Sequence, residues 1–131
     1  MTDSAAFTQW LAAYGAALSE SDWPACANLF SPDAIFLPTP FDSPVRGGEA
    51  IAARLSAFWR RFDGLSVNMD GVGPGWAHWT AAGRLDALGE PFLFDGILNA
   101  EFGPDGACTR LVLWTEALSP RESDILSDRD A

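Results

Sequence analysis

The 131-residue sequence predicts one α+β domain in which three N-terminal helices pack on one face of a curved, mostly antiparallel sheet. Three observations predict this class. Apolar residues recur at helical spacing as far as about residue 61, and from residue 65 onward they alternate with a period of two. Glycine and proline turns separate the later segments. A long sheet bent over helices would form a cone whose mouth faces the helix ends.

The first part of the chain is expected to form the three helices and one short strand. The helix over residues 4–19 has an apolar face at helical spacing, made of Phe7, Trp10, Leu11, Tyr14 and Leu18. The sequence SDWP at 21–24 fits the cap and first turn of a shorter helix, which SPD at 31–33 ends. A strand over 34–37 and an irregular proline-rich loop over 38–47 should follow.

The third helix should run from GGE at 47–49 to about residue 61, with an apolar face of Ile51, Leu55, Phe58, Trp59 and Phe62. Four strands are then expected, over 65–72, 76–87, 91–102 and 107–117. The turn sequences GVGPG at 71–75, LG at 88–89 and GPDG at 103–106 separate them. Residues 1–118 would form the domain, and 119–131 a flexible acidic C-terminal tail.

Composition excludes several kinds of chemistry. The net charge of −10, from 18 acids against 8 bases, argues against a nucleic acid or an anionic membrane as partner. All eight bases are arginine, so Schiff-base catalysis and a phosphate-loop lysine are impossible. One histidine and two well-separated cysteines cannot supply the usual four zinc ligands. We therefore expect no cofactor and no metal.

The location expected from the sequence is the cytoplasm. No stretch approaches the roughly 20 apolar residues that a membrane-spanning helix needs. The first residues carry neither a basic flank nor a signal-type apolar run. Cys26 and Cys108 are expected to be reduced, buried structural thiols.

Three stretches carry a resemblance to a known family. They are YGAALSESDWPACANLFSPDAIF at 14–36, PVRGGEAI at 44–51 and FDGILNAEFGPDG at 94–106. Their order and spacing resemble the nuclear transport factor 2-like superfamily, and within it the SnoaL-like and ketosteroid-isomerase-like small proteins. The resemblance spans about residues 5–118 and implies a cone-shaped, cystatin-like fold with a deep apolar pocket. It also implies a homodimer paired through the open face of the sheet.

The resemblance does not carry over a reaction. Ketosteroid isomerases use a tyrosine that donates to an oxyanion, a base aspartate and a protonated aspartate. Tyr14 matches the tyrosine, but Pro38 and Leu98 stand at the two acid positions. Neither side chain can move a proton, so ketosteroid isomerase chemistry is disfavoured. SnoaL-like cyclases also have an acid near the position of Leu98, which weakens that assignment too.

Four polar residues are candidates for catalysis, each with a plainer alternative. Tyr14 could hold a ligand oxygen or simply pack in the core. Asp95 lies within an apolar run and could act as an acid, but strict alternation turns it outward. His78 would be the best general base if it faced inward, although it falls on the polar side of its strand. Asp42 could be a mobile acid at the pocket mouth or a solvated turn residue.

The aromatic content predicts an aromatic ligand pocket in addition to a core. The residues expected to line it are Trp10, Tyr14, Phe36, Pro38, Phe41, Phe62, Trp79, Phe94, Leu98 and Trp114. The sequence thus predicts a domain that binds a small, largely apolar molecule. It could be a cofactor-free isomerase, dehydratase or cyclase with Tyr14 as hydrogen-bond donor. The alternatives are a non-catalytic ligand-binding or sensor domain and a purely structural homodimer.

Overall fold

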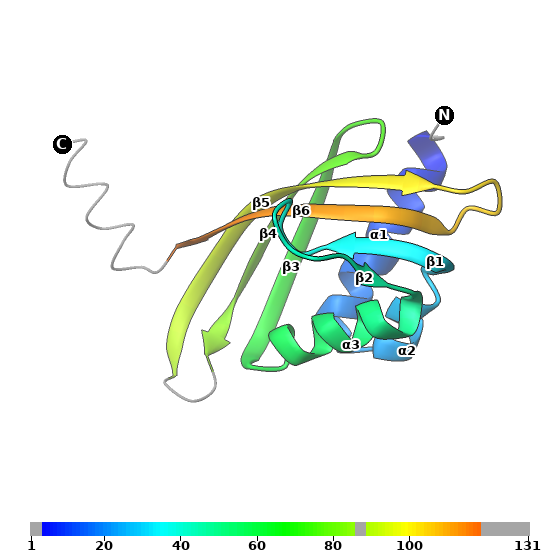
Figure 1. Cartoon of the computed structure of the whole chain (residues 1–131). Coiled ribbons are helices and arrows are strands. Elements are labelled where there is room, and N and C mark those ends of the chain that lie inside the picture. Colours follow the sequence, from blue (N-terminus) through cyan, green and yellow to red (C-terminus); the bar gives the residue numbers. More distant parts are fainter. Residues whose placement is uncertain (1–3, 86–88, 119–131) are drawn as a thin grey trace.

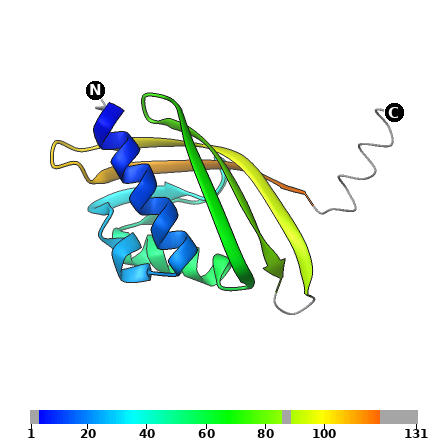
Figure 2. The ribbon, with the colours of Figure 1, turned by 180° about the vertical axis from the view of Figure 1, so that it is seen from behind.

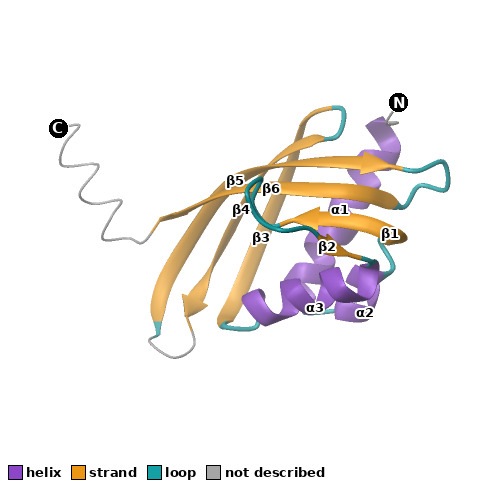
Figure 3. Cartoon of the chain, viewed as in Figure 1, coloured by secondary structure: helices purple, strands orange, loops and turns teal. Residues whose placement is uncertain are grey.

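Helices precede the long strands in the computed structural model, which describes residues 4–85 and 89–118 (Figures 1 and 3). The helices are α1 (Ser4–Glu20), α2 (Trp23–Ala27) and α3 (Gly48–Trp59). The strands are β1 (Phe30–Leu37), β2 (Val45–Arg46), β3 (Phe62–Gly73), β4 (Trp76–Leu85), β5 (Glu90–Phe102) and β6 (Cys108–Leu118). The predicted α+β class and the order of the long elements are confirmed.

One sheet holds all of these strands in the order β2-β1-β6-β5-β4-β3. Every neighbouring pair is antiparallel except β1 and β6, which run parallel. The long strands bend, and α1 crosses one face of the sheet, where it lies in front in Figure 2. Helices α2 and α3 lie together beside β1 and β2 (Figure 1). The sheet therefore has an inner face toward the helices and an outer face.

Side-chain alternation along β4 and β5 decides which residues face the helices. Ala77, Trp79 and Ala81 of β4 are buried, and the residues between them are not. Cross-strand partners share a face, and Trp79 pairs with Gly96 while His78 pairs with Ile97. The inner face thus carries Trp79 and Gly96, and the outer face carries His78 and Ile97. The question that the sequence left open, which face is inside, is answered by burial.

The predicted helix caps and apolar faces are largely observed. All five apolar residues of the first predicted helix face are buried: Phe7, Trp10, Leu11, Tyr14 and Leu18. The amide of Ala25 donates to the Asp22 carboxylate at 3.2 Å, and Pro24 lies in the first turn of α2, as the sequence indicated. These contacts fix the N-terminal third of the chain against the sheet.

Several boundaries differ from prediction. Strand β1 begins at Phe30, so SPD at 31–33 forms an irregular edge of the strand, and the pairing of β1 with β6 shifts register there. The loop expected over 38–47 contains β2, anchored where the amide of Gly47 donates to the carbonyl of Ala34 at 2.8 Å. Helix α3 ends at Trp59, and Phe62 begins β3. Residues 86–88 and the predicted tail at 119–131 lie outside the described residues.

In the described ranges, no helix has the length and apolar character needed to cross a membrane.

Candidate functional site

A cavity of about 260 Å³ lies between α3, the end of β1 and the inner face of the sheet. We call it the aromatic cavity. Its lining residues are Phe36, Pro38, Thr39, Asp42, Arg54, Leu55, Phe58, Trp59, Trp79, Leu113 and Thr115. Most of the apolar ones are buried, whereas Thr39, Asp42 and Arg54 are exposed. The cavity thus has apolar walls and a polar rim.

Helix α3 and the inner face of β4 supply the aromatic walls. Leu55, Phe58 and Trp59 lie three and four residues apart, so they project from one side of α3. The Trp59 ring meets Trp79 edge-to-face, with centroids 6.2 Å apart. Gly96 of β5 is the cross-strand partner of Trp79 of β4, and the two residues share the inner face. A β-carbon at Gly96 would lie 2.8 Å from the indole nitrogen of Trp79. The absence of a side chain at Gly96 therefore makes room for the indole of Trp79.

The rim is built by a tight turn after β1. The amide of Asp42 donates to the carbonyl of Thr39 at 3.2 Å, and the amide of Phe41 donates to the Thr39 hydroxyl oxygen at 3.2 Å. This turn holds the Asp42 carboxylate 4.0 Å from the Arg54 guanidinium on α3. Both side chains are about half exposed, at 45% and 52%. One acid and one base therefore face each other at the cavity entrance.

The indole N–H of Trp79 is a donor without an acceptor. The Trp79 side chain is 3% exposed, and its Nε1 is the only buried side-chain polar atom in the described part of the chain that has no hydrogen-bond partner. A buried donor without a partner costs free energy. The indole of Trp79 lines the aromatic cavity, but Nε1 itself has almost no accessible surface and lies close to Gly96, so a ligand oxygen could accept this hydrogen only after the indole shifts.

Tyr14 lies deeper than the aromatic cavity. It lines a void of about 10 Å³ together with Trp59, Trp79 and Leu113, which also form walls of the aromatic cavity. A void of this size is about the smallest that could hold one water. The Tyr14 ring stacks on Trp10, with centroids 5.0 Å apart. Trp59, Trp79 and Leu113 thus lie between the phenol and the larger space.

The Tyr14 phenol is neutral at ordinary pH. Burial raises its pKa well above the usual 10.0, and the thiols of Cys26 and Cys108 raise it further. A neutral phenol can donate a hydrogen bond but cannot act as a base. Tyr14 can therefore donate the hydrogen bond that the resemblance implies. It can reach a ligand in the aromatic cavity only if the wall residues Trp59, Trp79 or Leu113 move.

His78 and Asp95 come together on the outer face of the sheet. The His78 Nε2 and Asp95 Oδ1 atoms are 2.5 Å apart, and both side chains are about half exposed. The sheet separates this pair from the aromatic cavity. The outward direction that alternation favoured for both residues is what the structure shows. A molecule that contacts this pair would have to bind the outer face of the sheet.

The remaining predicted pocket residues are spread over the fold. Phe36, Pro38 and Trp79 line the aromatic cavity, and Leu98 lines the small void. Phe62 and Phe94 are buried and pack on Trp59 behind the cavity wall. Three others lie elsewhere. Trp10 belongs to the core beside Phe30, Phe41 is 96% exposed on the rim loop, and Trp114 is on the outer face.

Asp42 lies at the entrance of the aromatic cavity, where the sequence suggested a pocket mouth, but sequence reasoning missed Thr39 and Arg54 of the rim and about half of the wall. Phe58 and Trp59 belong to the predicted apolar face of the third helix, and this was the signal that could have found them, because that face meets the same space as Trp79. Arg54 and Thr39 have the pattern of solvent-exposed residues, so nothing in the sequence distinguished them. Within residues 4–85 and 89–118, no three His, Cys, Asp or Glu side chains are grouped so that they could hold a metal ion.

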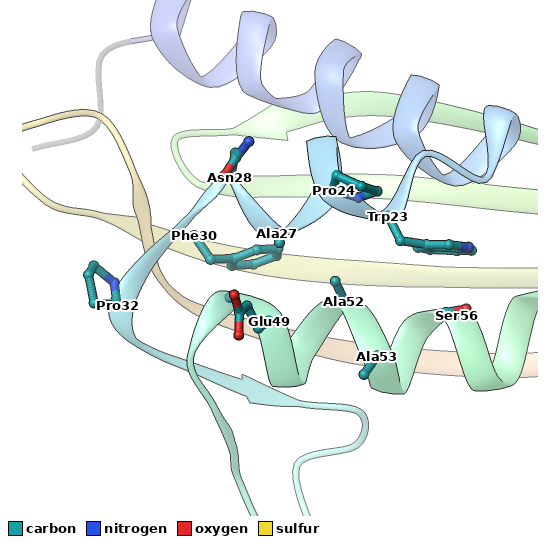
Figure 4. A pocket seen from close by; sticks show the side chains of 11 residues that line it. Trp23, Pro24, Ala27, Asn28, Phe30, Pro32, Glu49, Ala52, Ala53 and Ser56 are labelled. Carbon is teal, nitrogen blue, oxygen red and sulfur yellow. The ribbon is translucent and has the colours of Figure 1, made fainter.

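A larger hollow of about 640 Å³ lies between α2, α3 and the start of β1 (Figure 4). Trp23, Ala27 and Phe30 face Ala52 and Ser56 of α3 across it (Figure 4). Several other lining residues, among them Pro24, Asn28 and Glu49, are exposed, so the hollow is a surface groove. It combines no opposite charges and no enclosed aromatic wall. We therefore take the aromatic cavity as the candidate site.

A curved sheet closed by helices around an apolar cavity defines the cystatin-like, nuclear transport factor 2-like class of folds. Residues 10–111 match the family model of the SnoaL-like domain, and the chain belongs to this family. No curated protein sequence matches the chain.

Solved structures share the fold at low sequence identity. RV0760c from Mycobacterium tuberculosis, in complex with estradiol-17beta-hemisuccinate, is 14% identical with a TM-score of 0.66, over 82% of this chain and 91% of that one. A putative SnoaL-like polyketide cyclase from Shewanella denitrificans is 19% identical with a TM-score of 0.64, over 92% and 93%. The epoxide hydrolase/cyclase-like enzyme SalBIII is 13% identical with a TM-score of 0.69, over 88% and 95%.

Proposed function

We propose that the chain binds a small, largely apolar aromatic molecule in the aromatic cavity. The observation that carries this proposal is the composition of the cavity: buried rings of Phe36, Trp59 and Trp79 form its walls, and its charged groups gather at the rim. Ligand sites in proteins have this character, mostly apolar with a few placed polar groups. The complex of RV0760c with a steroid ester supports the proposal, because that protein has the same fold.

The cavity volume limits the size of the ligand. Ligand pockets commonly enclose about 300–1,000 Å³, and an engineered apolar cavity of about 150 Å³ holds one benzene. The aromatic cavity, at about 260 Å³, is suited to one or two rings. A four-ring steroid would require the rim turn or Phe58 to move. We therefore favour mono- and bicyclic ligands.

A second candidate function is a cofactor-free isomerase, dehydratase or cyclase. The observation that favours it is Asp42, a carboxylate at the entrance of an apolar cavity that could move a proton on a bound carbonyl compound. The similarity to SalBIII, an epoxide hydrolase/cyclase-like enzyme, is compatible with it. In this proposal Tyr14 donates a hydrogen bond to the ligand only after Trp59 or Trp79 shifts.

Binding is tested by filling the cavity. We expect indole, 2-naphthol or cinnamate to raise the melting temperature of the wild-type protein, because ligand that binds only the folded state stabilises it. Thr115→Trp should weaken binding at least tenfold, since Thr115 lines the cavity and the larger ring occupies it. Calorimetric titration measures the affinities.

The matched control is Glu116→Trp, which places the same ring on the next residue of β6, on the outer face. Its affinity for the same compounds should equal that of the wild type. The proposal is abandoned if no compound of the panel binds the wild type, or if both tryptophan variants bind equally well.

We also propose that two copies of the chain pair through the outer face of the sheet, in a cytoplasmic protein. Trp76, Leu93, Ile97 and Trp114 leave large apolar side chains partly exposed there, and Trp76 stacks on Trp114 with centroids 5.7 Å apart. Contiguous exposed apolar groups commonly mark an interaction surface. Cys26 and Cys108 are free thiols, which is compatible with a reducing compartment.

Pairing is tested by placing a charge on this face. Trp114→Glu should convert a dimer to a monomer, because a buried unpaired carboxylate at the contact is costly. Sedimentation velocity measures the oligomeric state. Phe41→Glu is the control, since Phe41 is an exposed ring away from the sheet, and this variant should stay dimeric. A monomeric wild type across the micromolar range would contradict the proposal.

A further inference from the structure

We propose that the ligand of the aromatic cavity is an aromatic carboxylate whose anionic group binds Arg54 and displaces Asp42 from it. The inference rests on the proposed ligand-binding function and names the ligand class and the residue that selects it.

Arg54 is placed to receive an anionic group at the end of an apolar wall. It lies one residue before Leu55 and four before Phe58 on α3, and all three line the cavity. Among the described residues that line the cavity, Arg54 is the only cation and Asp42 the only anion. A flat ring held between Phe58, Trp59 and Trp79 would therefore carry its substituent toward the guanidinium.

The existing partner of Arg54 holds it weakly. The closest approach of the Asp42 carboxylate is 4.0 Å, which is too long for a hydrogen bond, and both groups are about half exposed. Exposed ion pairs of this kind contribute about 0–1 kcal/mol. A guanidinium has five N–H donors in a planar fork that fits a carboxylate with two parallel hydrogen bonds. A ligand carboxylate can thus replace a loose contact with a stronger one.

Thr39 offers a second donor on the same rim. Its hydroxyl oxygen already accepts the amide hydrogen of Phe41 at 3.2 Å, which leaves the hydroxyl hydrogen available to donate. The same turn carries Asp42, so displacement of Asp42 and binding through Thr39 occur at one place. The rim therefore combines a loosely held cation, a hydroxyl donor and a carboxylate that competes with the ligand.

Total charge works against an anionic ligand. The chain carries a net charge of −10, so the protein as a whole repels an anion. Arg54 supplies a local attraction, and Asp42 reduces it when no ligand is bound. Removal of Arg54 should therefore weaken carboxylate binding, and removal of Asp42 should strengthen it.

The experiment compares 2-naphthoate with its neutral analogue 2-naphthamide at pH 7 by calorimetry. The wild type should bind naphthoate about tenfold more tightly than the amide, and Arg54→Gln should abolish this preference. Asp42→Asn should strengthen naphthoate binding about threefold and so widen the preference for naphthoate over the amide. Arg60→Gln removes an exposed cation at the end of the same helix, outside the cavity lining, and should preserve the preference.

The outcomes separate this inference from the proposed function. Equal binding of both compounds to the wild type, or a naphthoate preference retained in Arg54→Gln, would overturn the role of Arg54 while the cavity remains a binding site. Failure of both compounds in every variant, together with failure of indole, 2-naphthol and cinnamate to bind the wild type, would overturn the binding function itself. Unchanged melting temperatures of the unliganded variants establish that the substitutions leave the fold intact.

Discussion

Replacing Gly96 with alanine should destabilise the protein by about 3 kcal/mol, because the added methyl group would clash with atoms that already occupy its position. The new β-carbon would overlap the backbone carbonyl oxygen of Trp114 and would lie 2.8 Å from Nε1 and Cε2 of Trp79. The first contact is with backbone in the pairing of β5 with β6, which cannot shift without losing sheet hydrogen bonds. Urea denaturation of the two proteins measures the difference.

Gly73→Ala is the control. Gly73 ends β3, and a β-carbon there would meet no atom within 4 Å. We expect its stability to stay within about 0.5 kcal/mol of the wild type. A Gly96→Ala protein as stable as Gly73→Ala would show that Trp79 does not occupy the space opposite Gly96. The aromatic cavity would then lack the indole wall that Trp79 provides.

Alkaline pH should unfold the protein over a defined range. Burial raises the pKa of Cys26 from the ordinary 9.0 to about 11, and the charge of Asp22 adds to this effect. Burial also raises the pKa of Cys108 to about 12, against backbone hydrogen bonds that lower it. Because each thiol is harder to ionise in the folded state, the unfolded state loses protons first as pH rises. The contribution of the two protonated thiols to the free energy of unfolding is therefore fully present well below pH 9 and is lost as the pH rises above it.

The expected loss is large for a domain of this size. Where both thiols ionise in the unfolded state and not in the folded one, the free energy of unfolding falls by up to about 3 kcal/mol per pH unit, or roughly 4 kcal/mol between pH 9 and pH 11. Small domains have about 5–15 kcal/mol in total. The Tyr14 phenol adds to the loss above pH 10. Denaturation curves across this range give the slope.

Cys108→Ala isolates one of the two thiols. The variant starts less stable at pH 7 because a buried side chain is shortened, but its stability should fall about half as steeply between pH 9 and pH 10. An unchanged slope would mean that Cys108 ionises as easily in the folded protein as in the unfolded chain. Carrying out the titration under reducing conditions keeps both thiols free.

The architecture was predictable because its signals are periodic. The apolar face of α1 and the alternation along β4 and β5 each repeat over several residues, and both were confirmed. The cap at Asp22 is a single position, but the proline that follows it in the first turn made it recognisable. Boundaries failed where tertiary pairing overrides local preference. Pro32 suggested a chain break, yet the parallel partner β6 and a register shift accommodate it within β1.

The candidate site was less predictable because it depends on which of two apolar faces meets the helices. Leu113 and Trp114 are neighbours on β6 and both are large and apolar, so alternation alone could not assign Trp114 to the outer face. Arg54 gave no signal, since a single arginine on a helix is most often solvated. Only its proximity to Asp42, 12 positions away along the chain, distinguishes it.

The parallel pairing of β1 with β6 has a consequence for how the molecule is made. Phe36 lies beside Leu111 in the sheet, so the segment near the start of the chain obtains its central neighbour only from the segment near its end. Closing so long a loop is entropically unfavourable and slow. During synthesis β1 can pair with β2 as soon as both segments exist, but its pairing with β6 forms only after residues 108–118 have been made.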